Sequence, residues 1–281
     1  MFEITAKELL APGIVRILVA APQVAAKAAP GHFVIVQATT DGERIPLTIV
    51  SAQDGCIELI FQVMGVSTAL LAELEPTMEL PTLLGPLGVA PEVQPGEGRV
   101  LCVAGGVGAA PILPRARDFH EKGREVLTIL GARSKELLLL EDRLKEVSAE
   151  LHICTDDGSA GHHGFVTDLI SEVSQKHDIE EVLAIGPIPM MAAVSNITKQ
   201  LSLPTTVSLN ALMVDGTGMC GACRVTVGGE TRFTCVDGPE FDGHQVDFAG
   251  LAKRLCQYRD FEQLVYDRYQ NERGDCQCLK G

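Results

Sequence analysis

The stretch from residue 207 to residue 235 constrains this chain more than any other, because it holds three cysteines in a compact pattern. Cys220 and Cys223 form a C-x-x-C, and an alternating apolar run leads from Cys223 to Gly228-Gly229. Two glycines between such runs predict a tight β-hairpin. That hairpin returns the chain and brings Cys235 near Cys223. The sequence therefore predicts a metal centre of three thiolates, which are ligands typical of iron–sulfur clusters and of zinc.

The fourth ligand of this centre is predicted from spacing. In plant-type 2Fe–2S loops the ligands follow C-x4-C-x2-C, with the last cysteine further along the chain. Counting back from Cys220, the first position of that pattern is Asp215, so the loop reads D-x4-C-x2-C…C. We therefore expect a 2Fe–2S cluster bound by Asp215, Cys220, Cys223 and Cys235. A structural zinc site and an Asp215 that merely caps the loop stay open as alternatives. The other candidates for the fourth ligand are Cys256, Cys276 and Cys278.

The composition narrows the class of protein. A chain of 281 residues, 46% of them hydrophobic, is long enough for two domains and an appendage. The net charge of −14 argues against nucleic acid or an anionic membrane surface as a partner. No apolar run is long enough to span a bilayer, and no signal peptide is visible. Nine cysteines then indicate a reducing compartment, the cytoplasm, with metal or redox use rather than disulfides.

Residues 1–98 have the pattern of a small antiparallel β-barrel, because short apolar or alternating runs are separated by turn residues. After these runs a helix is expected, with Ser67 or Thr68 as its N-cap. The free N–H groups at the same helix start can instead bind a phosphate. The proline- and glycine-rich residues 81–98 mark a boundary. The predicted strands are Phe2–Thr5, Ile14–Ala20, His32–Ala38, Leu47–Ser51 and Cys56–Val63.

Residues 99–205 alternate apolar strands with helices, one of them over residues 134–149, which predicts a doubly wound parallel sheet. In such sheets ligands bind at the carboxyl ends of the strands. Glycine-bearing turns are expected there at Gly105–Gly108, Gly131–Arg133 and Gly186-Pro187. The first turn resembles a dinucleotide-binding turn but is not G-x-G-x-x-G, so an ordinary tight turn is the alternative.

Several polar residues near these turns have two interpretations each. Asp156-Asp157 can accept ribose hydroxyls or form a solvated turn, and Arg133 can face a phosphate or remain a surface charge. His162-His163 favours a solvated or ligand-lining loop over a metal site. No nucleophile–base arrangement and no paired-carboxylate site stand out. Residues 206–245 form the segment with the cysteine loop, and residues 246–281 are expected to form a helical tail.

The order of barrel, nucleotide sheet and cysteine loop resembles the ferredoxin–NADP reductase superfamily with a 2Fe–2S module at the C-terminus. The resemblance covers essentially the whole chain. Within that superfamily the chain is similar to the electron-transfer subunits of class 1B dihydroorotate dehydrogenases. It is more similar to the small subunits of electron-bifurcating NADH-dependent reduced ferredoxin:NADP oxidoreductases, because Asp215 stands where the dihydroorotate subunits have cysteine. The segments that carry the resemblance are GERIPLTI, GGVGAAP, IGPIPMM and VDGTGMCGACRV.

The resemblance implies FAD on the barrel. The family signature R-x-Y-S/T falls on residues 45–48, where Leu47 replaces the tyrosine and Arg44 lies one residue early. Thr48 is expected near flavin N5, as the residue closest to the chemistry. The remaining flavin contacts implied by the resemblance are Arg44, Pro46, Leu47, Ile60, Phe61, Gln62, Gly65, Ser67 and Thr68.

The resemblance also implies NAD(H) on the parallel sheet. In this function the chain exchanges hydride between NAD(H) and FAD and passes electrons through the 2Fe–2S cluster. The implied partner is a large glutamate synthase-like subunit with flavin and iron–sulfur clusters, and ferredoxin is reached through the complex. The alternatives are the dihydroorotate dehydrogenase subunit and a non-catalytic, zinc-stabilised nucleotide-binding protein. The implied nucleotide contacts are Gly105, Gly106, Val107, Gly108, Ala110, Pro111, Asp156, Asp157, Gly186, Pro187 and Met190.

Overall fold

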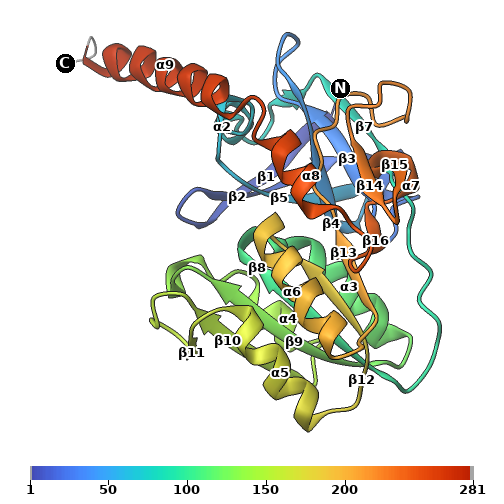
Figure 1. Ribbon diagram of the computed structural model, residues 1–281. Helices are drawn as coiled ribbons and strands as arrows, with labels where there is room; N and C mark the ends of the chain where they lie inside the picture. The colour runs from blue at the N-terminus through green and yellow to red at the C-terminus, as the bar shows by residue number, and fades with distance from the viewer. Residues whose placement is uncertain (1, 279–281) are drawn as a thin grey trace.

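The computed structural model describes residues 2–278, with the side chains of residues 2–272. It contains two seven-stranded sheets and a separate two-stranded hairpin (Figure 1). The two sheets lie one beyond the other, and the C-terminal helices run beside the first sheet (Figure 1). None of the helices in the described part of the chain is long and apolar enough to cross a membrane.

The first sheet is antiparallel, with the strand order β6-β1-β2-β5-β4-β3-β7. Its two edge strands follow each other in the chain, because β6 ends at Leu80 and β7 begins at Thr82. The sheet therefore curls almost into a closed barrel, as the strand pattern predicted. Its strands are β1 (Phe2–Ala11), β2 (Ile14–Ala20), β3 (Phe33–Gln37), β4 (Arg44–Gln53), β5 (Cys56–Gln62), β6 (Glu79–Leu80) and β7 (Thr82–Leu87), with the helices α1 (Pro22–Ala25) and α2 (Val66–Glu73).

The start of α2 differs from the prediction that Ser67 or Thr68 is its N-cap. The N-cap is Gly65, and Thr68 occupies the third helical position. From there the Thr68 hydroxyl accepts hydrogen bonds from the amides of Met64 and Gly65, at 2.9 and 3.1 Å. Ser67 donates to Glu43 Oε2 over 3.1 Å. Thr68 therefore still accepts hydrogen bonds from amide groups at the helix start, but its side chain does so from the third helical position.

The second sheet is parallel except for its last strand, and its order is β11-β10-β9-β8-β12-β13-β16. Strand order reverses between β8 and β12, as in a doubly wound fold. This confirms the predicted α/β architecture. The strands are β8 (Arg99–Gly105), β9 (Glu125–Ala132), β10 (Glu150–Thr155), β11 (His162–His163), β12 (Ile179–Ile185), β13 (Thr205–Ser208) and β16 (Glu240–Asp242), and the main helices are α3 (Ala109–Glu121), α5 (Val166–Lys176) and α6 (Ile188–Gln200).

The helix predicted over residues 134–149 is wrong. Only a short 3-10 turn, η2 (Lys135–Leu137), and a five-residue helix, α4 (Glu141–Lys145), form there. The break falls at Leu140, whose φ of 57° lies in the left-handed region. A continuous helix would expose part of the leucine run, whereas the break lets Leu139 and Leu144 both be buried. Tertiary packing therefore overrides the local helical preference.

The cysteine segment folds against both sheets. Gly228 and Gly229, with φ of 60° and 81°, make the predicted turn between β14 (Arg224–Val227) and β15 (Glu230–Phe233). A short helix, α7 (Thr234–Asp237), then leads into β16 at the edge of the parallel sheet. Two helices follow, α8 (Phe248–Leu255) and α9 (Arg259–Cys278). The last one projects from the body beside α2, where Tyr269 bonds to Glu73 (Figure 1).

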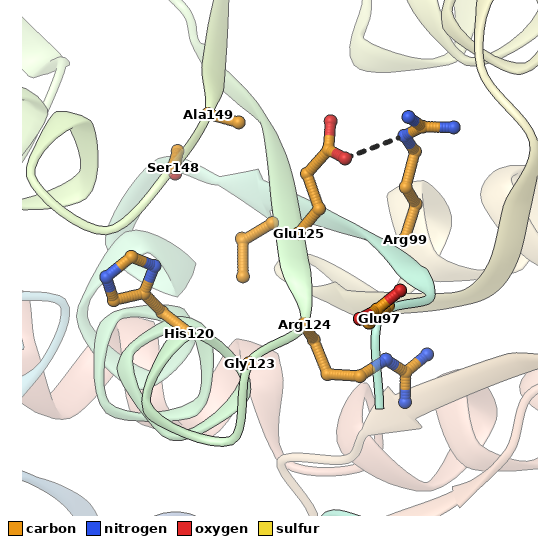
Figure 2. A pocket seen from close by; sticks show the side chains of 9 residues that line it. Glu97, Arg99, His120, Gly123, Arg124, Glu125, Ser148 and Ala149 are labelled. Atoms are coloured by element: carbon orange, nitrogen blue, oxygen red, sulfur yellow. Dashed lines mark ion pairs between the residues drawn. The ribbon is translucent and has the colours of Figure 1, made fainter. Parts of the chain in front are cut away.

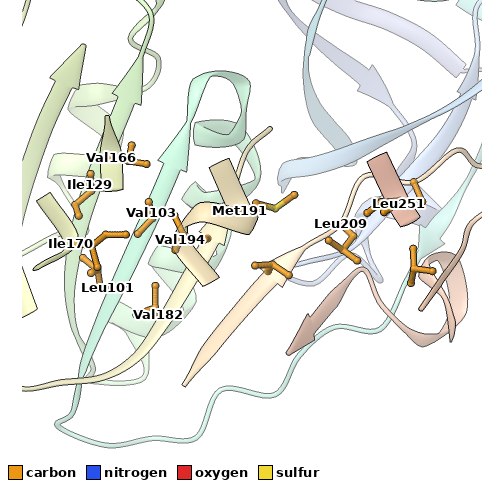
Figure 3. Close-up of a cluster of buried hydrophobic side chains, with 14 of the residues drawn as sticks. Leu101, Val103, Ile129, Val166, Ile170, Val182, Met191, Val194, Leu209 and Leu251 are labelled. Atoms are coloured by element: carbon orange, nitrogen blue, oxygen red, sulfur yellow. The ribbon is translucent and has the colours of Figure 1, made fainter. Parts of the chain in front are cut away.

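The core of the parallel sheet continues into this cysteine segment (Figure 3). Leu101 of β8 and Val194 of α6 belong to the same buried cluster as Leu251 of α8, Cys223 and Cys235. Each large apolar side chain that is fully buried contributes about 2 kcal/mol to the folded state. The cysteine segment is therefore fastened to the sheet through side chains and is not a loose appendage.

Candidate functional site

The carboxyl ends of the parallel strands form one row. Gly105 of β8 lies beside Gly131 of β9, and Ile185 of β12 lies beside Ala104 of β8. β10 continues the row next to β9. The three glycine-bearing turns predicted from the sequence therefore lie side by side, at the edge where open α/β sheets bind ligands.

The turns after β8 and β12 approach each other as closely as glycine allows. A Cβ on Gly108 would lie 2.2 Å from the carbonyl oxygen of Ile185, and one on Gly105 would lie 2.3 Å from Met190 Sδ. Gly106 has φ of 57° in the turn η1 (Gly106–Gly108), which opens α3. The first N–H groups of that helix have no intrahelical acceptor, so they can bind an anion.

All but two of the predicted nucleotide residues are thus brought together at the switch point. The turn and helix start, from Gly105 to Pro111, face the segment from Gly186 to Met190 across the reversal of strand order. Asp156 and Asp157 lie further out, at the end of β10, and both are exposed. Ser159 donates to Asp157 Oδ1 through its hydroxyl and amide, at 2.6 and 2.9 Å, and these bonds lower the pKa of Asp157.

The half of β4 that is expected to contact flavin has one open edge. Among the described strands, β3 alone pairs with β4 from Arg44 to Thr48, and β5 joins it from Ile49 onwards. Pro46 lacks a backbone N–H and therefore fits at such an edge. Leu47 and Thr48 are half-buried, and Arg44 is exposed. Among the described residues, this edge of the barrel therefore has no strand partner on its second side.

Two of the predicted flavin contacts on β5 are buried, unlike the residues at this open edge. Ile60 is 5% exposed and packs in a core shared with α3, and Phe61 is 2% exposed inside the barrel. Their side chains are committed to packing, so only their backbone is left for contact with a cofactor. β5 also touches η1, and α3 touches β4. The predicted flavin and nucleotide sites therefore adjoin each other.

In the cysteine loop the structure brings two of the four predicted ligands into contact. Cys223 and Cys235 are both 2% exposed, and their Sγ atoms lie 3.2 Å apart. Cys220 is exposed on the same loop. Asp215 accepts hydrogen bonds from the amides of Thr217 and Cys220, at 2.7 and 3.0 Å, and these bonds lower its pKa. Among the described residues, no three metal-ligating side chains gather around one point.

The chemistry of this loop fits an iron–sulfur cluster. It carries three thiols and one carboxylate, and Gly216, Gly218 and Gly221 all have positive φ, which lets the backbone wrap around a compact group. Burial and the neighbouring Cys223 thiol raise the pKa of Cys235 to about 12. A bound cation reverses this effect, because a coordinating thiol is deprotonated.

The loop lies on the rim of the barrel. A Cβ on Gly216 would meet Leu87 Cδ1 at 2.6 Å and Ile35 Cδ1 at 2.8 Å, so the loop backbone touches β7 and β3. The amide of Val89, just after β7, donates to the carbonyl of Gly238 over 2.7 Å. The cysteine loop and the open edge of β4 are thus both next to β3.

One residue that supports the loop has no pattern in the sequence that would predict its role. Arg254 of α8 donates to the carbonyl of Ala222, between the second and third predicted ligands, over 3.0 Å. The two residues are 32 positions apart, and only the folded chain brings them together. The further cysteine candidates stay untested: Cys256 is exposed at the end of α8, and Cys276 and Cys278 lie beyond the described side chains.

A cavity of about 640 Å³ lies at the opposite edge of the parallel sheet, where β8 and β9 begin (Figure 2). Its two arginines are already paired. Arg99 forms an ion pair with Glu125 at 3.0 Å, and Arg124 forms ion pairs with Glu180 and Glu181. The cavity also lies at the amino edge, whereas open α/β sheets bind ligands at the carboxyl edge.

Two family models match the parts of the chain that carry these features. The model described as an oxidoreductase NAD-binding domain matches residues 102–196. The model described as the iron–sulfur cluster binding domain of dihydroorotate dehydrogenase B matches residues 210–247. They coincide with the glycine turns and with the cysteine loop.

Known proteins match the chain over nearly its whole length. A Thermotoga maritima protein, named as a homolog of the dihydroorotate dehydrogenase B (NAD(+)) electron transfer subunit, is 41% identical over 97% of each chain. A structure from a study of flavin-based electron bifurcation by the NADH-dependent reduced ferredoxin-NADP oxidoreductase has a TM-score of 0.91. It is 40% identical and covers 96% of this chain and 98% of its own.

A more distant structure shares the fold alone. It is the ferredoxin NADP+ reductase of Neisseria gonorrhoeae with bound FAD and NADP, with a TM-score of 0.60 and 17% identity over 71% of this chain and 90% of its own. Fold, family models and full-length relatives agree. This chain is an oxidoreductase electron-transfer subunit of the ferredoxin reductase superfamily, and it belongs to the family that includes the electron-transfer subunit of dihydroorotate dehydrogenase B.

Proposed function

We propose that the chain is the small subunit of a flavin-based electron-bifurcating, NADH-dependent reduced ferredoxin:NADP oxidoreductase of the cytoplasm. FAD is held on the barrel, NAD(H) at the switch point of the parallel sheet, and a 2Fe–2S cluster in the cysteine loop. The partner is a large glutamate synthase-like subunit, through which ferredoxin is reached. The match over 96% of the chain at 40% identity is the observation that carries this proposal.

The arrangement of the three sites supports it. The glycine turn η1 touches β5, and the cysteine loop touches β3 and β7 of the same barrel. The barrel therefore contacts both the nucleotide turn and the cysteine loop. Bound FAD would exchange a hydride with NAD(H) and single electrons with the cluster, because flavin is stable in both one-electron and two-electron redox states.

The residues of the chain have positioning and binding roles in this function. The amides of Gly106, Val107 and Gly108, in the turn η1 that opens α3, would bind the nucleotide diphosphate. Thr48, at the open edge of β4, would lie beside flavin N5. Asp215 and the three cysteines hold the cluster, and the glycines between them bring the backbone close to it. Packing of Gly216 against Leu87 of β7 would bring the cluster next to the barrel.

An anaerobic titration of the purified chain with NADH and NADPH tests this proposal. We expect NADH to bleach the flavin absorbance at a lower concentration than NADPH does, because the carboxylates at the end of β10 favour a ribose without a 2′-phosphate. A flavin-containing protein that neither nucleotide reduces would contradict the hydride-transfer function. A stronger response to NADPH would reverse the assigned nucleotide preference.

The electron-transfer subunit of a class 1B dihydroorotate dehydrogenase is the second candidate. It is favoured by the family model over residues 210–247 and by the name of the Thermotoga maritima relative. The protein that co-purifies with the chain separates the two functions. A dihydroorotate-oxidising flavoprotein supports the second candidate, and a large subunit with several iron–sulfur clusters supports the first.

A further inference from the structure

Glu58 of β5 is a charged residue that lies buried where the barrel meets the parallel sheet. Its side chain is 1% exposed. Two groups from neighbouring barrel strands bind it: Arg16 of β2 donates to Oε1 over 2.6 Å, and Ser51 of β4 donates to Oε2 over 2.7 Å. An isolated carboxylate would be costly at such a place, so these bonds are needed to keep it there.

Arg143 reaches the same carboxylate from the other sheet. It lies on α4, after β9, and its two terminal nitrogens donate to the two oxygens of Glu58 over 2.7 and 2.9 Å. A guanidinium that binds both oxygens fixes the orientation of the two groups as well as their distance. The partners are 85 residues apart, so the contact joins the barrel to the parallel sheet.

The position of α4 depends on such contacts. A helix of five residues is too short to be stable by itself. It begins after the left-handed Leu140, and Leu144 packs in a core that also contains Ile14 and Ile60 of the barrel. Apolar packing and the ion pair therefore act at the same junction, and only the ion pair is directional.

The junction adjoins the predicted reaction site. Glu58 lies on β5, the barrel strand that touches the glycine turn η1. We propose that Glu58 and Arg143 are positioning residues, which hold the parallel sheet against the barrel in the orientation that hydride transfer requires. The inference rests on the proposed exchange of hydride between NAD(H) and FAD. Such a reaction needs its atoms about 3 to 3.5 Å apart, and an error of about 1 Å can slow it a hundredfold.

The chain offers a matched control for this proposal. Arg16 and Arg143 bind the same oxygen of Glu58, and their side chains are 29% and 30% exposed. Arg16 lies within the barrel, whereas Arg143 comes from the parallel sheet. Each variant removes two charge-assisted hydrogen bonds. Arg16→Met removes those to Glu58 and Glu8 within the barrel, and Arg143→Met removes the two to Glu58 that cross the junction.

The test is rapid mixing of the full chain, purified anaerobically, with increasing NADH, followed at the flavin absorbance. We expect Arg143→Met to lower the limiting rate of flavin reduction at least tenfold and to leave the NADH dissociation constant within about twofold, because the glycine turn is untouched. Arg143→Lys keeps one donor and is expected to recover part of the rate. Arg16→Met is expected to stay within about twofold of the unaltered chain in both quantities.

Two kinetic outcomes would overturn the proposal. One is an unchanged limiting rate in Arg143→Met, and the other is an equal loss in Arg16→Met. Hydrogen exchange of α4 gives a second readout that needs no flavin chemistry. We expect faster exchange over residues 141–145 in Arg143→Met and not in Arg16→Met, and unchanged exchange in both would also contradict the positioning role. If NADH fails to reduce the flavin of the unaltered chain, the proposed function fails, and hydrogen exchange still decides the role of the contact.

Discussion

Asp215 combines two properties in one residue of the predicted metal loop. It occupies the first position of a ligand pattern, and its carboxylate accepts hydrogen bonds from the amides of Thr217 and Cys220. The hydrogen bonds shape the loop whether or not Asp215 binds iron. Substitutions at this position therefore separate the ligand role from the capping role.

Asp215→Cys tests the ligand role. If Asp215 binds iron, the substitution produces an all-cysteine cluster, and we expect its midpoint potential to move toward the value of about −400 mV that is typical of plant-type clusters. A redox titration followed by electron paramagnetic resonance measures this. Asp215→Asn is the control, since its amide oxygen still accepts a loop hydrogen bond. An unchanged potential in Asp215→Cys would leave Asp215 only its capping role.

The contribution of Glu58 to the free energy of unfolding is expected to depend on pH. Burial alone would raise the pKa of this carboxyl, but hydrogen bonds from Arg143, Ser51 and Arg16 lower it from 4.5 to about 2. A lowered folded-state pKa means that the stabilisation is full above pH 4.5 and is lost as the pH falls toward 2. Glu58→Gln is therefore expected to cost about 3 kcal/mol of unfolding free energy at pH 6, and about 1 kcal/mol less at pH 3.5.

Urea unfolding at the two pH values measures this difference. Glu8→Gln is the matched control, because Glu8 also binds Arg16 but its side chain is 57% exposed. We expect its cost to stay below about 1 kcal/mol, as for other exposed ion pairs. A gap between Glu58→Gln and the unaltered chain that does not narrow at the lower pH would contradict the lowered pKa.

At the scale of elements, the turn from β8 into α3 makes the clearest prediction. A methyl group on Gly108 would collide with the carbonyl oxygen of Ile185, because this turn touches the end of β12. Gly108→Ala is therefore expected to weaken NADH binding at least tenfold while flavin and iron contents are kept. In Gly96→Ala the nearest atom lies at 3.7 Å, so its NADH affinity should be normal. Equal affinities in the two variants would exclude this turn as the nucleotide site.

The elements that could be predicted from the sequence are those with local causes. The hairpin follows from Gly228-Gly229, and the barrel strands follow from apolar runs between turns. The helix predicted over residues 134–149 failed because its leucines are drawn into a core shared with distant barrel strands. The contact of Glu58 with Arg143 could not be predicted for the same reason, since nothing near either residue in the sequence indicates the other.

The same distinction between local and distant causes applies to the candidate sites. The ligand pattern and the glycine turns could be read from spacing, because each lies within one loop. Only the packing of the sheets brings η1 against β5 and the cysteine loop against β7. The sequence therefore predicted which sites to look for, and the fold determines that they adjoin.

At the scale of the whole molecule, a second buried ion pair joins the cysteine segment to the parallel sheet. Arg115 of α3 donates to Glu240 of β16 over 2.9 Å and to Asp118, and only 4% of its side chain is exposed. Gly31 of the barrel lies beside the same pair. The barrel, the parallel sheet with its helices, and the cysteine segment therefore meet around Arg115.

Arg115→Met is expected to destabilise the chain by about 3 kcal/mol, because it leaves a buried carboxylate without its cation. Chemical denaturation measures this, with Arg117→Met on the same helix as the control. A cost equal to that of the control would show that Arg115 does not hold the parts together.

The central claim about the molecule is that one chain holds flavin on the electron path between a nicotinamide site and an iron–sulfur cluster. The most direct measurement is the ultraviolet–visible spectrum of the anaerobically purified protein, with assays of flavin and iron. We predict a brown protein with flavin bands, about one FAD and about two irons per chain. A colourless protein that carries zinc and no flavin, after loss of cofactors during preparation is excluded, would contradict the claim and leave only the fold.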